Sequence, residues 1–283
     1  MEQKLAIITG ANGGMGSTLV RDVAKAGYTA IMACKNFDKA TPVFERLKSE
    51  TGGDIILKHL DLSSFESIRN FAQDIKDNYQ HIDLQLNNAG TLCHKPEQSA
   101  ENYEKTVAVN YLGHYVLTNL LLPLMGPGSR VVNMVSLTVR YGHLKPTLFQ
   151  PVDDKHFNRF TTYSDSKKAF FYFTLDAADA WKERGITVNC ADPGIVSTNI
   201  IRMGNAVVDK LCDWFFRPII KTPTQGAATM LRLALDPSLD GQTGGFYANK
   251  KLKKVNSKIV NSPEREMLRQ MTADIMAKHG FKF

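Results

Sequence analysis

The chain has 283 residues, of which 43% are hydrophobic and 22% are charged, with only 4 cysteines. This composition is typical of a globular protein with a large core, and it excludes a disordered, collagen-like or disulfide-stapled chain. A formal net charge of +7 would suit a nucleic-acid or membrane partner. However, residues 1–248 carry 26 basic and 25 acidic side chains, whereas residues 249–283 carry 9 and 3. The excess charge therefore belongs to the C-terminal segment.

Short apolar runs alternate with longer amphipathic segments, which is the pattern of a parallel sheet covered by helices on both faces. The predicted strands are Leu5–Ile8, Thr29–Ala33, Ile55–Leu60, Ile82–Leu86, Arg130–Val135, Thr187–Ala191 and Gly245–Ala248. The predicted helices are Ser17–Ala26 (closed by Gly27), Ser64–Asn78 (opened by a Ser63/Glu66 capping box), about Ala100–Leu124, Tyr163–Arg184, Thr224–Leu235 and Ser262–Lys278. We therefore expect a single-domain α/β fold of the Rossmann type, a doubly wound parallel sheet of about seven strands.

Two irregular stretches interrupt this pattern, Leu137–Thr161 and Thr198–Pro223, and loops of this length are usually functional. In the first, we expect the pocket wall to contain Tyr141, His143, Leu148 and Phe149. In the second, Val207–Phe216 is amphipathic, which fits a surface helix or a lid over an apolar substrate; a membrane-surface contact is a third interpretation.

The four cysteines are widely spaced and form no CxxC pair, which predicts reduced, mostly buried thiols in a cytoplasmic protein: Cys34, Cys93, Cys190 and Cys212. The N-terminus enters an apolar strand directly, without the shape of a signal peptide. The longest apolar-rich stretch, Tyr111–Met125, is shorter than the roughly 20 residues that cross a bilayer. We expect no transmembrane helix, and a membrane contact is the least favoured of the three interpretations of Val207–Phe216.

A glycine-rich loop follows the first predicted strand and precedes the first predicted helix, with the sequence TGANGGMG over Thr9–Gly16. Glycines at these positions permit a tight turn and let the backbone approach a pyrophosphate, while the helix N-terminus offers free N–H groups. The placement predicts a dinucleotide site formed by Gly10, Asn12, Gly14, Met15 and Gly16. Residues 1–248 would then be the nucleotide-binding catalytic domain, and residues 249–283 a basic extension of the same domain.

The end of the second strand bears on the choice of cofactor. NAD sites usually place an acid there for the ribose diol, but the residues that follow this strand are Cys34, Lys35 and Asn36, and we expect Lys35 and Asn36 to contact the cofactor. Lys35 fits a 2′-phosphate, which an acid would repel, so we expect NADP(H) in preference to NAD(H). Asp38 fits an N-cap of the next helix better than a ribose ligand.

Tyr163 and Lys167 are spaced i, i+4 on a predicted helix and therefore share one face. A fixed cation close to a phenol favours the phenolate, and we expect it to lower the pKa of Tyr163 from its ordinary value near 10. That would suit proton transfer at a carbinol or carbonyl oxygen. The pair alone is also what an ordinary amphipathic face would show.

Further motifs accompany this pair along the chain, and together they resemble the motifs of the short-chain dehydrogenase/reductase family. The matching residues, in order, are the Thr9–Gly16 loop, Asp61-Leu62, Asn87-Asn88-Ala89-Gly90, Asn110, Ser136, Tyr163 with Lys167, and Pro193-Gly194 with Thr198. The resemblance covers roughly residues 4–250. The interval from Ser136 to Tyr163 is similar to that of the retinol-dehydrogenase and protochlorophyllide-reductase-like branch.

The resemblance implies a role for each matching residue. Tyr163 would be the general acid/base, Lys167 would lower its pKa and bind the nicotinamide ribose, Ser136 would bind the substrate oxygen, and Asn110 would hold a relay water. The remaining positions would contact the cofactor: Asp61, Leu62, Asn88, Ala89, Gly90, Pro193, Gly194 and Thr198. Two positions depart from the commonest pattern, since Val135 stands where a second serine is frequent and Gly13 where some NADP enzymes have a basic residue.

The sequence thus predicts an NADP(H)-dependent oxidoreductase that interconverts a carbonyl and an alcohol on a medium-sized, largely apolar substrate. Reduction of an activated C=C bond, or an idle NADP(H)-binding sensor, are the alternatives. Seven scattered histidines indicate no metal site, and the lysine-rich tail has no aromatic platform for nucleic acid. The resemblance also implies a homo-oligomer, a dimer or tetramer formed through Ala100–Leu124 and Tyr163–Arg184.

Overall fold

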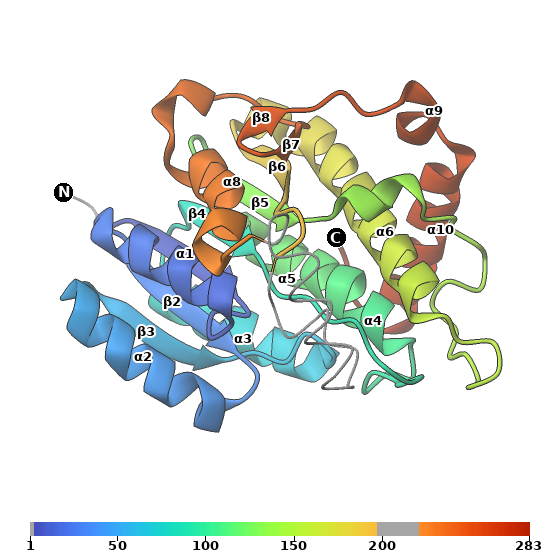
Figure 1. The fold of residues 1–283 in the computed structure, drawn as a ribbon, viewed down its shortest axis with the longest axis horizontal. Helices are drawn as coiled ribbons and strands as arrows, with labels where there is room; N and C mark the ends of the chain where they lie inside the picture. The colour runs from blue at the N-terminus through green and yellow to red at the C-terminus, as the bar shows by residue number, and fades with distance from the viewer. Residues whose placement is uncertain (1–2, 197–220) are drawn as a thin grey trace.

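Eight strands form one sheet in the computed structural model, which describes residues 3–196 and 221–283 (Figure 1). The strands are β1 (Leu5–Thr9), β2 (Thr29–Cys34), β3 (Ile55–His59), β4 (Leu84–Asn87), β5 (Arg130–Met134), β6 (Thr187–Asp192), β7 (Phe246–Ala248) and β8 (Lys251–Leu252). Their order is β3-β2-β1-β4-β5-β6-β7-β8, and only β8 runs antiparallel to its neighbour. The expectation of a doubly wound parallel sheet is confirmed, with β8 as one strand more than the seven that the sequence predicts.

Helices cover both faces of this sheet, as Figure 1 shows. One face carries α1 (Gly14–Lys25), α2 (Phe37–Thr51) and α8 (Pro223–Leu235). The other carries α3 (Phe65–Asn78), α4 (Lys105–Val107), the π-helical segment η1 (Ala108–Leu112), α5 (Gly113–Leu121) and α6 (Arg159–Trp181). Shorter helices are η2 (Leu122–Leu124), η3 (Leu137–Arg140), η4 (Lys182–Arg184), η5 (Pro237–Leu239) and α9 (Ser257–Val260), and the last helix is α10 (Pro263–Lys278). β1 and β2 are buried along their whole length, which explains why both read as unbroken apolar runs.

Several helix starts differ from the prediction. The helix α1 begins at Gly14, three residues before the expected Ser17. Asn36, not Asp38, caps α2, and Ser64, not Ser63, caps α3. Ser63 is instead turned toward Asp61, since both its backbone N–H and its hydroxyl donate to Asp61 Oδ1, at 2.9 and 2.6 Å.

The helix expected from about Ala100 begins at Lys105. Ahead of it, Gln98 and Glu104 form an antiparallel bridge, and Asn102 adopts a positive φ of 64° that ends helical geometry. Lys105–Leu124 is the one helix of the described chain long and apolar enough to cross a membrane by length and composition, but 61% of its window is buried inside the protein. It packs on the same face of the sheet as α3 and α6 and contacts both, which is the position of a core helix.

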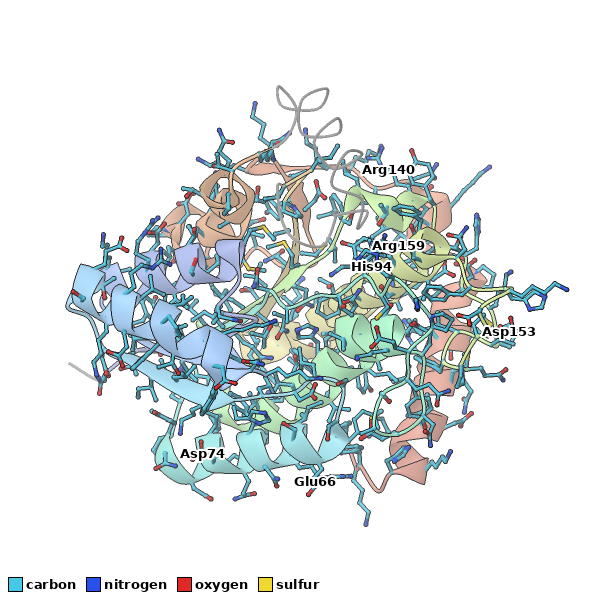
Figure 2. The ribbon with its side chains drawn as sticks, turned by 60° about the horizontal axis from the view of Figure 1, so that its bottom comes forward. Glu66, Asp74, His94, Arg140, Asp153 and Arg159 are labelled. Carbon is cyan, nitrogen blue, oxygen red and sulfur yellow. The ribbon has the colours of Figure 1, made fainter. Side chains whose placement is uncertain are left out.

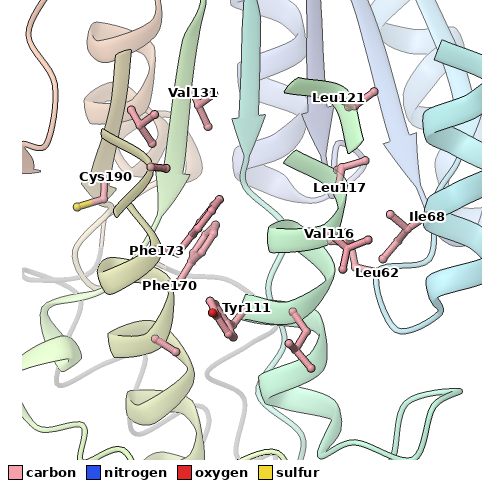
Figure 3. Close-up of a cluster of buried hydrophobic side chains, with 14 of the residues drawn as sticks. Leu62, Ile68, Tyr111, Val116, Leu117, Leu121, Val131, Phe170, Phe173 and Cys190 are labelled. Atoms are coloured by element: carbon pink, nitrogen blue, oxygen red, sulfur yellow. The ribbon is translucent and has the colours of Figure 1, made fainter. Parts of the chain in front are cut away.

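Aromatic side chains pack the space between α5 and α6 (Figure 3). Phe170 and Phe173 stack at 6.2 Å between ring centres, and Phe170 also stacks on His114 of α5 at 5.0 Å. Tyr111 is fully buried beside them and stacks on Phe149 at 6.1 Å. This packing fixes α6, the helix that carries Tyr163 and Lys167, against the sheet.

The C-terminal helix α10 lies alongside α6 (Figure 1). Arg265 and Arg269 both contact Asp176 of α6 at 2.6 Å, and Thr272 shares a 2.7 Å hydrogen bond with Tyr111. The helix thus covers part of the α5–α6 face on which the sequence led us to expect a dimer contact.

Candidate active site

The phosphate loop turns sharply at the carboxyl end of β1. Gly10 has a φ of +62°, and a Cβ there would lie 2.9 Å from the Ala89 backbone, so only glycine fits. A Cβ on Gly16 would overlap the carbonyl oxygen of Gly10. The loop and the first turn of α1 are therefore packed as closely as a pyrophosphate cradle requires.

The helix α1 differs from the other long helices of the described chain at its N-terminus. Gly13 occupies the N-cap and offers no side-chain acceptor. By contrast, Asn36, Ser64, Asn158 and Ser262 cap α2, α3, α6 and α10 with side-chain oxygens. The free N–H groups of α1, including those of Gly14 and Met15, are thus left for an external anion, which fits a dinucleotide phosphate.

A cavity of about 510 Å³ lies beyond the ends of β1, β2 and β3. It brings together seven of the expected cofactor residues: Gly10, Asn12, Lys35, Asn36, Asp61, Leu62 and Ala89. The cavity also contains Lys39, which the sequence analysis missed although it follows Lys35 by four residues in the first turn of α2.

Lys35 is held by an acid inside this cavity. Its Nζ lies 2.8 Å from Asp61 Oδ2 and 3.3 Å from Ser63 Oγ. Burial disfavours the Asp61 carboxylate, but the hydrogen bonds from Lys35 and Ser63 outweigh that effect, so the pKa of Asp61 lies below its usual range. Asp61 is therefore ionised at neutral pH and is a hydrogen-bond acceptor at the cavity wall.

A second, narrow cavity of about 80 Å³ lies between the phosphate loop and the end of β6. It is lined by seven more of the expected residues: Met15, Asn88, Gly90, Tyr163, Lys167, Pro193 and Gly194. Ala89 lines the larger cavity and its neighbours Asn88 and Gly90 line the smaller one, so the two adjoin at the ends of β1 and β4, where the strand order of the sheet reverses. Ligands of doubly wound folds bind at this reversal.

Hydrogen bonds fix the loop that joins the two cavities. Asn88 Nδ2 donates to the carbonyl oxygen of Thr9 at 2.9 Å, and Ala89 N–H donates to Thr9 Oγ1 at 3.0 Å. Thr9 Oγ1 also lies 3.0 Å from Nε2 of the fully buried His114. Burial lowers the pKa of His114 to about 3, so the ring is neutral and supports the loop by hydrogen bonding rather than by charge.

Tyr163 and Lys167 lie on one face of α6, with Lys167 Nζ 5.7 Å from the tyrosine ring centre. Burial raises the pKa of Tyr163 to about 12, the Asp192 carboxylate adds to this rise, and a hydrogen bond with Ser136 opposes it. Burial lowers the pKa of Lys167 to about 7, and its Nζ donates to the Met134 carbonyl at 2.8 Å. The net shift is opposite to the expected one: burial outweighs any stabilisation of the phenolate by Lys167, so the pKa of Tyr163 is raised rather than lowered.

Asn110 lies in the π-helical segment η1 and is fully buried. Its Oδ1 accepts from Thr91 N–H at 2.8 Å, and its Nδ2 donates to the Thr91 carbonyl at 2.9 Å and to Ser166 Oγ at 3.0 Å. Its side chain thus ties the loop after β4 to α6. Local π-helical geometry is frequent at functional sites.

Asp192 is a second feature that the sequence analysis missed, although it directly precedes Pro193-Gly194. It is buried, and its Oδ1 accepts from Leu137 N–H at 2.9 Å. The bond links the end of β6 to Leu137, which is the first residue of η3 and follows the N-cap Ser136.

None of the four residues expected in the pocket wall lines either cavity, and Leu148 packs partly buried against the core. Tyr141 is 75% exposed and the His143 side chain 76% exposed, whereas Phe149 belongs to the core.

Figure 2 shows Arg159, at the start of α6, beside His94 of the loop after β4, with 3.0 Å between Nη1 and Nδ1. Thr198 and the amphipathic Val207–Phe216 stretch lie outside the described residues.

Cys34, Cys93 and Cys190 are free and buried, and Cys212 lies outside the described residues. Within 3–196 and 221–283, no three His, Cys, Asp or Glu side chains cluster as metal ligands would.

These features define a class: a Rossmann-type, NAD(P)-dependent oxidoreductase. A family model described as short chain dehydrogenase matches residues 4–149 and 151–207. The chain is 30% identical over 276 residues to retinol dehydrogenase 11 of Homo sapiens, covering 96% of this chain and 86% of that protein. It is 32% identical over 268 residues to retinol dehydrogenase 14 of Mus musculus, covering 88% and 78%.

Among solved structures, a short chain dehydrogenase from Shigella flexneri 2a str. 301 complexed with NADP matches with a TM-score of 0.66 and 26% identity. The match covers 88% of this chain and 97% of that one. The chain belongs to the short chain dehydrogenase family, in its retinol-dehydrogenase-like branch.

Proposed function

We propose that the chain is an NADP(H)-dependent oxidoreductase that interconverts a carbonyl and an alcohol on a medium-sized, largely apolar substrate. The observation that carries this proposal is the phenol of Tyr163, hydrogen-bonded to Ser136 and facing the same narrow cavity as Lys167. With its pKa raised to about 12, Tyr163 is protonated at neutral pH. A protonated phenol is the form that can donate to a carbonyl oxygen, as the reductive direction requires.

When bound, the cofactor supplies the hydride that the carbonyl carbon accepts. The residues of this chain provide the proton and the orientation. Tyr163 donates its phenolic proton to the carbonyl oxygen, and the Ser136 hydroxyl donates a hydrogen bond to the same oxygen as negative charge develops on it. Lys167, in its ammonium form, stabilises the phenolate that remains. Asn110 holds the loop and helix around Lys167 in place, and would support the water that returns a proton to it.

The cofactor side of the proposal rests on charge. Lys35 and Lys39 both face the larger cavity, and the tip of β2 has no acid. Two cations suit the 2′-phosphate of NADP(H), and the matching Shigella enzyme is complexed with NADP. Asp61 and Asn88 would contact the adenosine, whereas Pro193, Gly194 and Thr198 would orient the nicotinamide amide.

The substrate class rests on the mouth of the site. Leu137 follows Ser136 and is 42% exposed, and Ile195 follows Gly194 and is 49% exposed. Apolar side chains next to two site residues suit an apolar substrate, and the relatives named retinol dehydrogenases act on such a molecule. For self-association, we propose a homo-oligomer, a dimer or tetramer, whose contacts lie outside the part of the α5–α6 face that α10 covers.

A product analysis tests the proposal. The purified protein would be incubated with NADPH or NADH and, separately, nonanal, all-trans-retinal and 2-cyclohexenone. We expect NADPH-dependent formation of nonanol and retinol. Saturated ketone from the enone without any alcohol would instead indicate a C=C reductase. Binding of NADPH with no product from any probe would identify a nucleotide-binding sensor.

A further inference from the structure

Lys168, the residue after Lys167, is buried and joins three elements. Its Nζ lies 2.5 Å from Glu264 Oε2 in the first turn of α10 and donates to the Gly142 carbonyl at 2.9 Å. The side chains of Lys168 and Glu264 are 7% and 21% exposed. Glu264 is well placed to hold this charge, because a carboxylate in the first turn of a helix is favoured by the helix dipole.

The loop on the other side of Lys168 is packed directly against α6. A Cβ on Gly142 would lie 2.7 Å from the Ser164 carbonyl oxygen and 2.9 Å from Lys168 Cβ. The next residue, His143, donates its backbone N–H to Asp165 Oδ1 at 2.7 Å. Two successive loop residues are therefore pinned to α6 at positions on either side of Lys167.

This loop follows η3, the short helix of which Ser136 is the N-cap. The position of Ser136 relative to Tyr163 is thus set at two points: by Asp192, which accepts from Leu137, and by the bonds at Gly142 and His143. The ammonium of Lys168 cannot remain buried without compensating partners. If Glu264 were neutral, the lysine would be driven toward solvent and the Gly142 bond would be lost.

We propose that Lys168 and Glu264 are positioning residues, and that their buried ion pair holds the Ser136 loop against the catalytic helix. The C-terminal helix α10 then helps to position the active-site loop in addition to covering α6. The inference deepens the proposed function, since it assigns a role in the same carbonyl reduction.

The test combines kinetics with hydrogen–deuterium exchange on the full chain. For Glu264→Gln and Lys168→Met, we expect kcat with nonanal and NADPH to fall about tenfold, while the Kd for NADPH stays within twofold. Amides of residues 137–145 should exchange at least tenfold faster in both variants. The double variant should lose no more than either single one, because the pair acts as a unit. Lys168→Arg, which keeps charge and donors, should retain kcat within threefold.

Arg265→Ala is the matched control, because Arg265 adjoins Glu264 but bonds to Asp176 rather than to Lys168. It should lower the melting temperature and leave kcat unchanged. Equal losses of kcat in Arg265→Ala and Glu264→Gln, or losses that multiply in the double variant, would overturn the proposal. The two readouts separate the two hypotheses. A wild-type protein that reduces no carbonyl refutes the proposed function, whereas unchanged exchange of residues 137–145 in the Glu264→Gln and Lys168→Met variants refutes the positioning role.

Discussion

Replacing the two lysines of the larger cavity should remove the preference for the 2′-phosphate. A unit charge about 4 Å from a phosphate contributes about 4 kcal/mol at an effective dielectric of 20 and about 1 kcal/mol in bulk water. The Lys35 side chain is 58% exposed, so screening places its contribution near the lower end, at about 1–2 kcal/mol. We therefore expect Lys35→Ala and Lys39→Ala each to weaken NADPH binding by about 5- to 30-fold.

Fluorescence titration with NADPH and NADH in parallel measures this effect. NADH lacks the 2′-phosphate, so its Kd should change less than twofold. In Lys35→Ala the Asp61 carboxylate also loses its 2.8 Å partner, which should make this variant the weaker of the two toward NADPH. Lys48→Ala, on an exposed site in the last turn of α2, is the control and should bind both cofactors normally. Equal weakening of NADPH and NADH, or no weakening of NADPH, would refute the reasoning.

Three further predictions concern the loop, the buried lysine and the last helix. Gly16→Ala should abolish NADPH binding and lower the melting temperature, because its Cβ would overlap the carbonyl oxygen of Gly10. Gly13→Ala, whose Cβ would lie 3.5 Å from that oxygen, should keep the wild-type NADPH binding and melting temperature. Thermal unfolding with and without NADPH checks this. Lys167→Met should raise the melting temperature of the free protein at pH 6, and the gain should shrink by pH 9. The reason is that the pKa of Lys167 in the folded protein is lowered to about 7, so the buried ammonium costs stability below that pH. The stability of the wild type recovers as the pH rises toward the pKa of an unfolded lysine, near 10.4. A gain that does not depend on pH would contradict this. Arg265→Ala should remove a 2.6 Å bond to Asp176 and about 1–3 kcal/mol of stability, seen as a drop of a few degrees in the melting temperature.

The sheet could be predicted because buried parallel strands read as continuous apolar runs, and seven of the eight strands appear within a few residues of their expected positions. The strand β8 could not, because it has two residues and one is a lysine. Helix starts were less certain, since Asn36 and Asp38 are both good N-cap residues and only the end of β2 at Cys34 decides between them.

The grouping of the glycine loop with Asn88, Ser136 and Pro193-Gly194 could be predicted because each follows a strand of the same parallel sheet, and those strand ends meet at one edge. The Lys168–Glu264 pair could not, because 95 residues of chain separate its members and neither belongs to a motif. The pKa of Tyr163 was misjudged for a related reason: the spacing from Lys167 is visible in the sequence, but the burial of both groups is not.

Substitution of Tyr163 by Phe addresses the proposed chemistry with a single atom. The phenylalanine keeps the ring and removes only the hydroxyl that bonds to Ser136. We expect NADPH to bind with a Kd within twofold of wild type while the rate of nonanal reduction falls by about 10²- to 10⁴-fold. Reduction of nonanal at the wild-type rate by Tyr163→Phe would show that the proton comes from another group and would contradict the mechanism.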